Sequence, residues 1–200
     1  YNRAMRPLHG TALLGGAFDP PHAAHIQMAE RALALGCERV VFVPSANPPH
    51  KRCTADFFDR VAMLEAAIAG RADMSVDTIE GGDGAVHYSY LMLPRLVDKY
   101  GDCVFVVGGD SLIDLGKWRE PDKVVAEVPL LAFPRKDRDE SFAAALEFWR
   151  GRGARIYADD FMPDGVSSTA ARYLASMRDY SALSPEVAEY VRRRGLYDWY

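Results

Sequence analysis

The chain has 200 residues, of which 49% are hydrophobic and 26% charged, a balance that fits a globular protein with a sizeable core. Its formal net charge of −4 gives no global positive field, which argues against a nucleic-acid-binding or membrane-surface protein. No apolar run reaches the ~18 residues of a membrane span, and no signal peptide opens the chain. The three widely spaced cysteines fit neither a disulfide framework nor a zinc site, so we expect a cytoplasmic protein.

Short apolar runs alternate with amphipathic segments along the chain. The sequence predicts strands, in chain order, at 11–16, 39–44, 75–79, 103–109, 129–134 and 155–158. It predicts helices at about 22–36, 57–70, 88–100, 120–127, 139–152, 168–177 and 184–194. This alternation predicts an α/β fold of the Rossmann-like, doubly wound type, with a mostly parallel sheet and helices on both faces. We expect one domain over 9–200, after a flexible leader or cloning remnant at 1–8.

The unusual residue clusters of the sequence follow its strands. The stretch GAFDPPHAAH follows the first strand, SANPPHK the second, GDSL the fourth and PRK the fifth. Ligands of open α/β sheets bind outside the carboxyl ends of the strands. The clusters are therefore expected at the ligand-binding edge of the sheet.

The first cluster has the residue types of an anion site. Gly15 and Gly16 allow a tight turn and close approach of backbone N–H groups to a ligand. Asp19 is expected to cap the first helix, and His22 and His25, three residues apart, share a face of its first turn. The alternative is an ordinary glycine turn with two histidines on a helix surface.

A second anion-binding pattern, VSSTAAR, lies near the C-terminus. Ser167 or Ser168 can cap a helix, Thr169 lies in its first turn, and Arg172 shares a face with Ser168. Hydroxyls and a guanidinium at a helix N-terminus suit phosphate oxygens. The alternative is an ordinary capped helix with a solvated arginine.

These two motifs carry a resemblance to a known family. GGAFDPPHAAH resembles the G-G-x-F-D-P-x-H-x-G-H signature of the nucleotidyltransferase superfamily, and VSSTAAR resembles its I-S-S-T-x-x-R motif. NPPHK, GGDSL followed by KW, and the terminal YVRRRGLY are similar to those of bacterial nicotinate-nucleotide adenylyltransferases, from about Leu13 to Tyr197. The chain departs from the usual pattern at Ala17, Ala24 and Ala171.

The resemblance implies adenylyl transfer from ATP to nicotinate mononucleotide, giving nicotinate adenine dinucleotide and pyrophosphate in NAD biosynthesis. The residues it marks as catalytic are His22, His25, Lys51 and Arg172. Those it marks for ATP and its phosphates are Gly15, Gly16, Ala17, Phe18, Asp110, Ser167, Ser168 and Thr169. Those it marks for the mononucleotide are Tyr88, Ser89, Trp118 and Arg135. Mg²⁺ is the expected cofactor, held by substrate phosphates rather than protein ligands.

Several alternatives stay open at this point. Lys51 is otherwise a mobile surface lysine, Asp110 a helix cap, and Asp77 and Glu80 solvated charges. Rival functions are nucleotidyl transfer to another phosphate acceptor, such as phosphopantetheine, and a catalytically silent nucleotide-binding domain. No nucleic-acid or membrane partner is expected, and assembly into a homo-oligomer is left open.

Overall fold

The computed structural model describes residues 8–48, 52–81, 86–134 and 139–198. The chain divides into two compact units, each built from three stretches of sequence. The first unit comprises Tyr1–Leu14, Met28–Val40 and Tyr88–Pro163, and the second comprises Gly15–Gln27, Val41–His87 and Asp164–Tyr200. Residues 1–7 of the expected leader lie outside the described residues, and the single domain expected over 9–200 stays a prediction.

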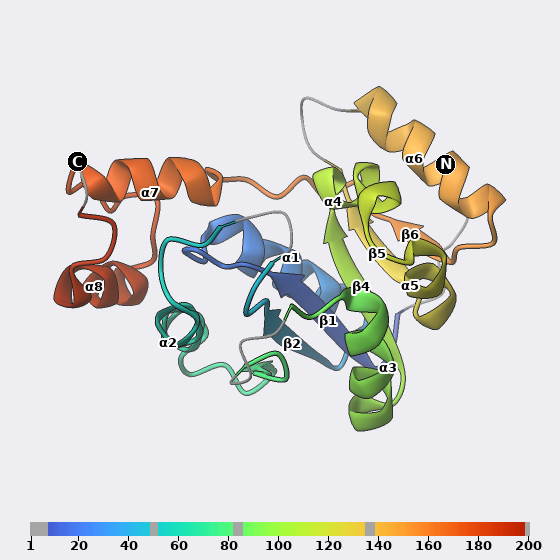
Figure 1. Ribbon diagram of the computed structural model, residues 1–200, viewed down its shortest axis with the longest axis horizontal. Helices are drawn as coiled ribbons and strands as arrows, with labels where there is room; N and C mark the ends of the chain where they lie inside the picture. The colour runs from blue at the N-terminus through green and yellow to red at the C-terminus, as the bar shows by residue number, and fades with distance from the viewer. Residues whose placement is uncertain (1–7, 49–51, 82–85, 135–138, 199–200) are drawn as a thin grey trace. The chain divides into compact units, whose positions relative to one another are not determined.

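Six parallel strands form one sheet in the order β3-β2-β1-β4-β5-β6, which confirms the predicted fold class (Figure 1). The strands are β1 (Thr11–Gly16), β2 (Arg39–Pro44), β3 (Met74–Val76), β4 (Cys103–Gly108), β5 (Leu130–Phe133) and β6 (Ile156–Ala158). Every residue of β5 is buried, as is all of β2 after its first residue, which explains their unbroken apolar runs. The third strand ends earlier than predicted, because the Asp77 carboxylate accepts a hydrogen bond from Ile79 N at 2.9 Å and turns the chain.

The predicted helices are all found, with ends within three residues of those expected. They are α1 (Ala23–Ala34), α2 (Phe57–Ala67), α3 (Ser89–Tyr100), α5 (Pro121–Glu127), α6 (Asp139–Gly151), α7 (Ser168–Ser176) and α8 (Pro185–Arg194). The sequence did not predict α4 (Gly109–Ile113) or η1 (Leu115–Lys117), because such short helices show no measurable periodicity. Among the helices in the described part of the chain, none is long and apolar enough to cross a bilayer.

In the first unit, β4 lies between β1 and β5, and β6 adds to β5 (Figure 1). Leu13 of β1 aligns with Phe105 of β4, which in turn aligns with Leu130 of β5. Arg31 of α1 forms two hydrogen bonds of 2.9 Å to the buried Asp159 carboxylate that follows β6. This bidentate pair ties the end of α1 to the edge of the sheet.

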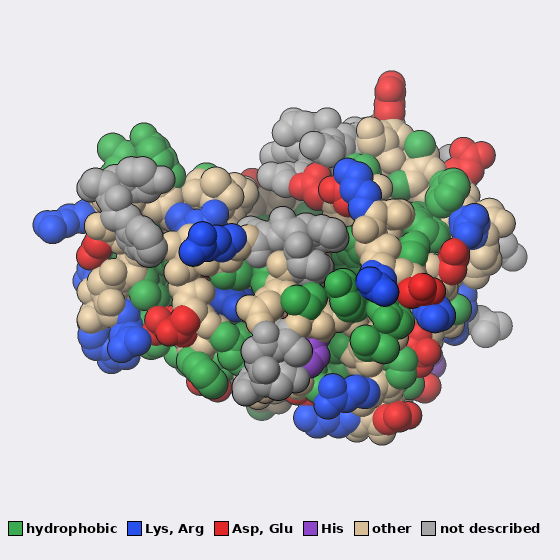
Figure 2. All heavy atoms as spheres, viewed as in Figure 1, with side chains coloured by type: hydrophobic (Ala, Val, Ile, Leu, Met, Phe, Trp, Pro, Cys, Tyr) green, Lys and Arg blue, Asp and Glu red, His purple; other side chains and the backbone are tan. Residues whose placement is uncertain are grey.

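The second unit packs α2, α7 and α8 around a shared apolar cluster. Its buried members include Met63 of α2, Ala171 and Ala175 of α7, and Val187 and Val191 of α8. The ends of α8 follow helix-capping rules: the Ser184 hydroxyl accepts from Val187 N, and Gly195 follows in a left-handed conformation with φ +60°. Basic side chains gather over α8 in Figure 2, and those in its last turn complement the helix dipole.

Candidate active site

The loop between β1 and α1 folds over the Phe18 side chain. Phe18 has a φ of +51° and is 1% exposed, and its ring meets those of Phe42 and His25 edge-on at 5.7 and 4.9 Å. A Cβ on Gly16 would lie 3.1 Å from the Phe18 ring, so this close approach favours glycine. Gly16 thus does more than turn the chain, because it lets the loop close on a buried aromatic ring.

His22, the last residue before α1, and His25, in the first turn of α1, contact each other. Their ring centroids lie 3.8 Å apart, and His22 N donates a hydrogen bond to His25 Nδ1 at 3.2 Å. Because Nδ1 of His25 accepts, the neutral ring carries its proton on Nε2. His25 is therefore held in the tautomer that presents an Nε2–H donor, which is the form that an anion requires.

The start of α7 docks onto the same loop. Ser167 is the N-cap and accepts from Ala170 N at 3.2 Å, whereas Ser168 is buried and donates to Pro20 O at 3.1 Å. Arg172 donates to Asp19 O at 2.6 Å and to Thr169 Oγ1 at 3.2 Å. The side chain of Arg172 is 20% exposed, so the alternative of a solvated arginine is wrong. The two sequence motifs come together in the second unit.

The prediction that Asp19 caps α1 is wrong. The helix begins at Ala23, and the Asp19 carboxylate is fully buried. It accepts hydrogen bonds from Thr54 N at 2.6 Å, Ala55 N at 3.1 Å and Tyr197 Oη at 2.8 Å. A buried carboxylate needs several donors, and these lie on distant segments rather than on the helix that follows.

Sequence reasoning missed Arg60. Its side chain is 1% exposed and donates to Ala17 O and Ser45 O, both at 2.7 Å, and to Ala46 O at 3.0 Å. The Arg60 guanidinium thereby joins the loop after β1 to the loop after β2. The only sequence signal was an arginine on the apolar face of the predicted second helix, which is ambiguous because long basic side chains often reach solvent from such positions.

The interpretation of Asp77 and Glu80 as solvated charges is also wrong. The two residues are 6% and 3% exposed. Glu80 Oε2 accepts from Ala46 N at 3.0 Å, so Ala46 is held by Glu80 through its N–H and by Arg60 through its carbonyl. Burial raises the pKa of Glu80 above its ordinary value.

Three of the residues expected to hold the mononucleotide lie in the first unit: Tyr88, Ser89 and Trp118. Tyr88 and Ser89 stand at the start of α3, and the Arg119 guanidinium lies 5.4 Å from the Tyr88 ring centroid. Trp118 follows η1, is partly exposed and meets Phe105 edge-on at 6.3 Å. Asp110 also belongs to this unit. It lies within the first turn of α4, whose N-cap is Gly108, so it is not the helix cap that one alternative supposed.

Two expected site residues, Lys51 and Arg135, lie outside the described residues. Among the residues that are described, no group of three or more His, Cys, Asp or Glu side chains could hold a metal ion.

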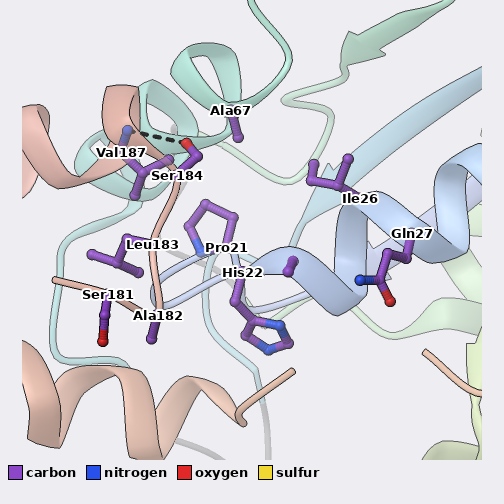
Figure 3. A pocket seen from close by; sticks show the side chains of 11 residues that line it. Pro21, His22, Ile26, Gln27, Ala67, Ser181, Ala182, Leu183, Ser184 and Val187 are labelled. Carbon is purple, nitrogen blue, oxygen red and sulfur yellow. Dashed lines mark hydrogen bonds between the residues drawn. The ribbon is translucent and has the colours of Figure 1, made fainter. Parts of the chain in front are cut away.

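A cavity of about 330 Å³ lies beside the first turn of α1, in the second unit (Figure 3). Ile26, Leu183 and Val187 supply much of its wall, and His22 lies at its edge. These apolar walls do not suit phosphate groups.

Comparisons with known proteins identify the family of the chain. The cytidylyltransferase-like family model matches residues 13–173. A probable nicotinate-nucleotide adenylyltransferase from Rubrobacter xylanophilus is 36% identical, over 92% of this chain and 90% of the relative. A probable nicotinate-nucleotide adenylyltransferase from Caldicellulosiruptor bescii is 30% identical, over 93% and 97% of the two chains.

The fold also matches a solved structure, that of Plasmodium falciparum nicotinic acid mononucleotide adenylyltransferase complexed with NaAD. Its TM-score is 0.77 at 20% identity, over 95% of this chain and 98% of that one. Since the family model covers most of the chain and the bacterial relatives align along almost its whole length, the chain belongs to the cytidylyltransferase-like family and, within it, to the nicotinate-nucleotide adenylyltransferases.

Proposed function

We propose that the protein transfers the adenylyl group of ATP to the phosphate of nicotinate mononucleotide and releases pyrophosphate. A phosphate oxygen of the mononucleotide attacks the α-phosphorus of ATP, and the bond from that phosphorus to the α–β bridging oxygen breaks. The products are nicotinate adenine dinucleotide and pyrophosphate. The attacking phosphate is mostly dianionic at neutral pH, since its second pKa lies near 6, so the reaction requires no general base.

Without a base to supply, the protein contributes positioning and stabilisation of charge. His25, with Nε2–H as its donor, is assigned to the transferring phosphate, and His22 to the neighbouring phosphate oxygens. Arg172 and Lys51 are assigned to the departing pyrophosphate, together with the backbone N–H groups at Gly15 and Gly16 at the end of β1. The observation that carries this assignment is that Arg172 is anchored to the backbone of the loop that leads into the paired histidines, His22 at its end and His25 in the first turn of α1.

Mg²⁺ enters this proposal as part of the nucleotide substrate. When bound to the ATP oxygens it supplies further neutralisation of the phosphate charge. We therefore assign it no protein ligand, because the hard oxygen atoms that it prefers are those of the triphosphate and water.

The carboxylate of the nicotinate ring is the feature by which the proposed site would distinguish nicotinate mononucleotide from its amide counterpart. A pyridine carboxylate is a charged acceptor, whereas the carboxamide of the alternative mononucleotide has N–H donors and no charge. A site that offers donors to the carboxylate, such as backbone N–H groups or the Ser89 hydroxyl, would leave them unpaired against the amide. We assign Trp118 to stacking on the pyridine ring, with Tyr88 beside it and Arg135 as a further contact.

We place the reaction in the cytoplasm. Cys37 and Cys103 are buried free thiols, a state that a reducing compartment maintains.

A substrate panel tests the proposed function. The purified protein is given ATP and Mg²⁺ with nicotinate mononucleotide, nicotinamide mononucleotide or phosphopantetheine, and pyrophosphate release is measured. We expect kcat/KM to favour the nicotinate compound over the amide by about 10⁴-fold, the scale of polar complementarity. Equal efficiency with the amide would contradict the acid-specific site, turnover of phosphopantetheine alone would support the rival transferase, and no release with any acceptor would support a silent domain.

A further inference from the structure

The proposed reaction assigns no role to Tyr197, the last residue of the YVRRRGLY sequence, yet this residue is buried and has a constrained backbone. Its side chain is 3% exposed and packs in the cluster that includes Ala171, Ala175 and Val191. Its φ of +69° lies in the left-handed region, which is unfavourable for a residue with a Cβ. Such a conformation persists only where the surrounding contacts enforce it.

The contact that gives Tyr197 a place in the site is its hydroxyl. It donates to Asp19 Oδ1 at 2.8 Å and lies 3.9 Å from Met63 Sδ. Burial and the neighbouring Asp19 carboxylate both raise the pKa of this phenol, so it stays neutral and remains a donor at any working pH. The hydroxyl is thus a permanent partner of a fully buried carboxylate.

Asp19 passes this contact on to Arg172. The Arg172 guanidinium donates to Asp19 O at 2.6 Å, and Arg172 Nη1 lies 3.8 Å from Asp19 Oδ2. Asp19 therefore fixes the guanidinium both by its backbone and by its charge. Tyr197 is therefore linked through Asp19 to Arg172, which we assign to the departing pyrophosphate.

We propose that Tyr197 is a positioning residue for adenylyl transfer: its hydroxyl orients the buried Asp19 carboxylate, which in turn sets the Arg172 guanidinium against the triphosphate. This inference rests on the proposed function for the identity of the triphosphate. Without the Tyr197 hydroxyl, the Asp19 carboxylate would accept hydrogen bonds only from Thr54 N and Ala55 N within the described part of the chain. A buried charge with fewer donors recruits others, and the Arg172 guanidinium, with Nη1 3.8 Å from Asp19 Oδ2, is close enough to be recruited. We expect the guanidinium to turn toward the carboxylate and away from the phosphates.

The test is Tyr197→Phe, and the chain offers a matched control. Tyr190 donates from its hydroxyl to Asp59 Oδ1, also at 2.8 Å and also within the second unit. Tyr190→Phe removes the same kind of bond to a carboxylate, but one that does not lead to Arg172. Melting temperature, kcat, the KM of each substrate and ATP affinity by calorimetry are measured for both variants.

We expect both variants to lose a few degrees of melting temperature, while Tyr197→Phe alone lowers kcat/KM for ATP by about 10-fold or more, because small misplacements of charge-stabilising groups are costly. The KM of the mononucleotide should stay within about twofold, since its expected contacts do not include this network. In an Arg172→Lys background the kinetic effect of Tyr197→Phe should largely vanish, because residues that act through one another are not additive.

The outcomes separate this inference from the proposed function. Normal turnover and ATP affinity in Tyr197→Phe, with a melting temperature lowered as in Tyr190→Phe, would overturn the positioning role and leave the function intact. Equal kinetic losses in both variants, or a full loss that persists in the Arg172→Lys background, would also overturn it. If the wild type binds ATP but accepts no mononucleotide, the proposed acceptor is wrong, and weaker ATP binding by Tyr197→Phe alone would still support the positioning role.

Discussion

Replacement of Arg60 by methionine removes the buried cation that joins two loops of the site while keeping an unbranched apolar side chain. Three carbonyl oxygens, those of Ala17, Ser45 and Ala46, lose a charged donor at 2.7, 2.7 and 3.0 Å. Each buried acceptor left unpaired costs about 1–3 kcal/mol. Part of this is offset, because the desolvation of the guanidinium no longer has to be overcome and its Nε–H has no hydrogen-bond partner in the described part of the chain.

Three unpaired carbonyls at about 1–3 kcal/mol each, less this offset, give an expected net loss for Arg60→Met of about 3–5 kcal/mol of unfolding free energy. For a chain of this length it corresponds to a fall in melting temperature of roughly 6–20 °C. The assay is thermal unfolding followed by circular dichroism. We also expect lower kcat/KM at temperatures where the variant is folded, since the loop that leads into His22 and the first turn of α1, which carries His25, loses an anchor.

Arg152→Met is the matched control for this measurement. Arg152 also makes three hydrogen bonds, at 3.0, 2.8 and 2.8 Å, but to the exposed carboxylate of Asp122. Exposed ion pairs contribute little to stability, so its melting temperature should change by less than about 4 °C. Arg60 would not be the anchor described above if Arg60→Met melted within about 2 °C of the wild type, or if the two variants lost the same melting temperature.

Three further predictions follow from single side chains. His25→Ala should lower kcat by roughly 10²-fold with little change in melting temperature, whereas normal turnover with a large loss of stability would indicate a structural histidine. Burial raises the pKa of Glu80 above the ordinary glutamate value of 4.5, so ionisation of Glu80 destabilises the wild-type fold as the pH rises. The stability of Glu80→Gln relative to the wild type, measured from urea midpoints, should therefore increase from about pH 4 to about pH 8. A constant or decreasing difference would contradict this. Burial also raises the pKa of Cys37 and Cys103 to about 11, so a thiol reagent near neutral pH should label the less buried Cys53 first and the other two only on unfolding.

The alternation of apolar runs and amphipathic segments was enough to predict the fold. Doubly buried strands such as β2 and β5 have continuous apolar sequences, and most helices are long enough to show their period. The sequence failed at two short features: the end of the third strand and the short helix α4. The strand at 75–79 stops at Val76 because the Asp77 side chain captures the backbone, and α4 is too short to be seen as a pattern.

The site could be predicted only where chemistry is encoded locally. Ser167, His22 and His25 act within a few residues of their own position, so spacing reveals them. The roles of Asp19 and Arg60 depend on partners far away in the chain, such as Tyr197 for the former and the loop after β2 for the latter. Sequence spacing carries no information about such partners, and an aspartate before a helix favours the capping interpretation on local grounds alone.

The central claim, direct adenylyl transfer to the phosphate of nicotinate mononucleotide, is tested most directly by following that phosphate's oxygen atoms. The mononucleotide is prepared with ¹⁸O in its phosphate and incubated with ATP, Mg²⁺ and the enzyme, and the products are analysed by mass spectrometry. We expect a dinucleotide that keeps all of the ¹⁸O, with one labelled oxygen bridging the two phosphorus atoms, and unlabelled pyrophosphate. Label in the pyrophosphate, or AMP formed without dinucleotide, would contradict direct transfer.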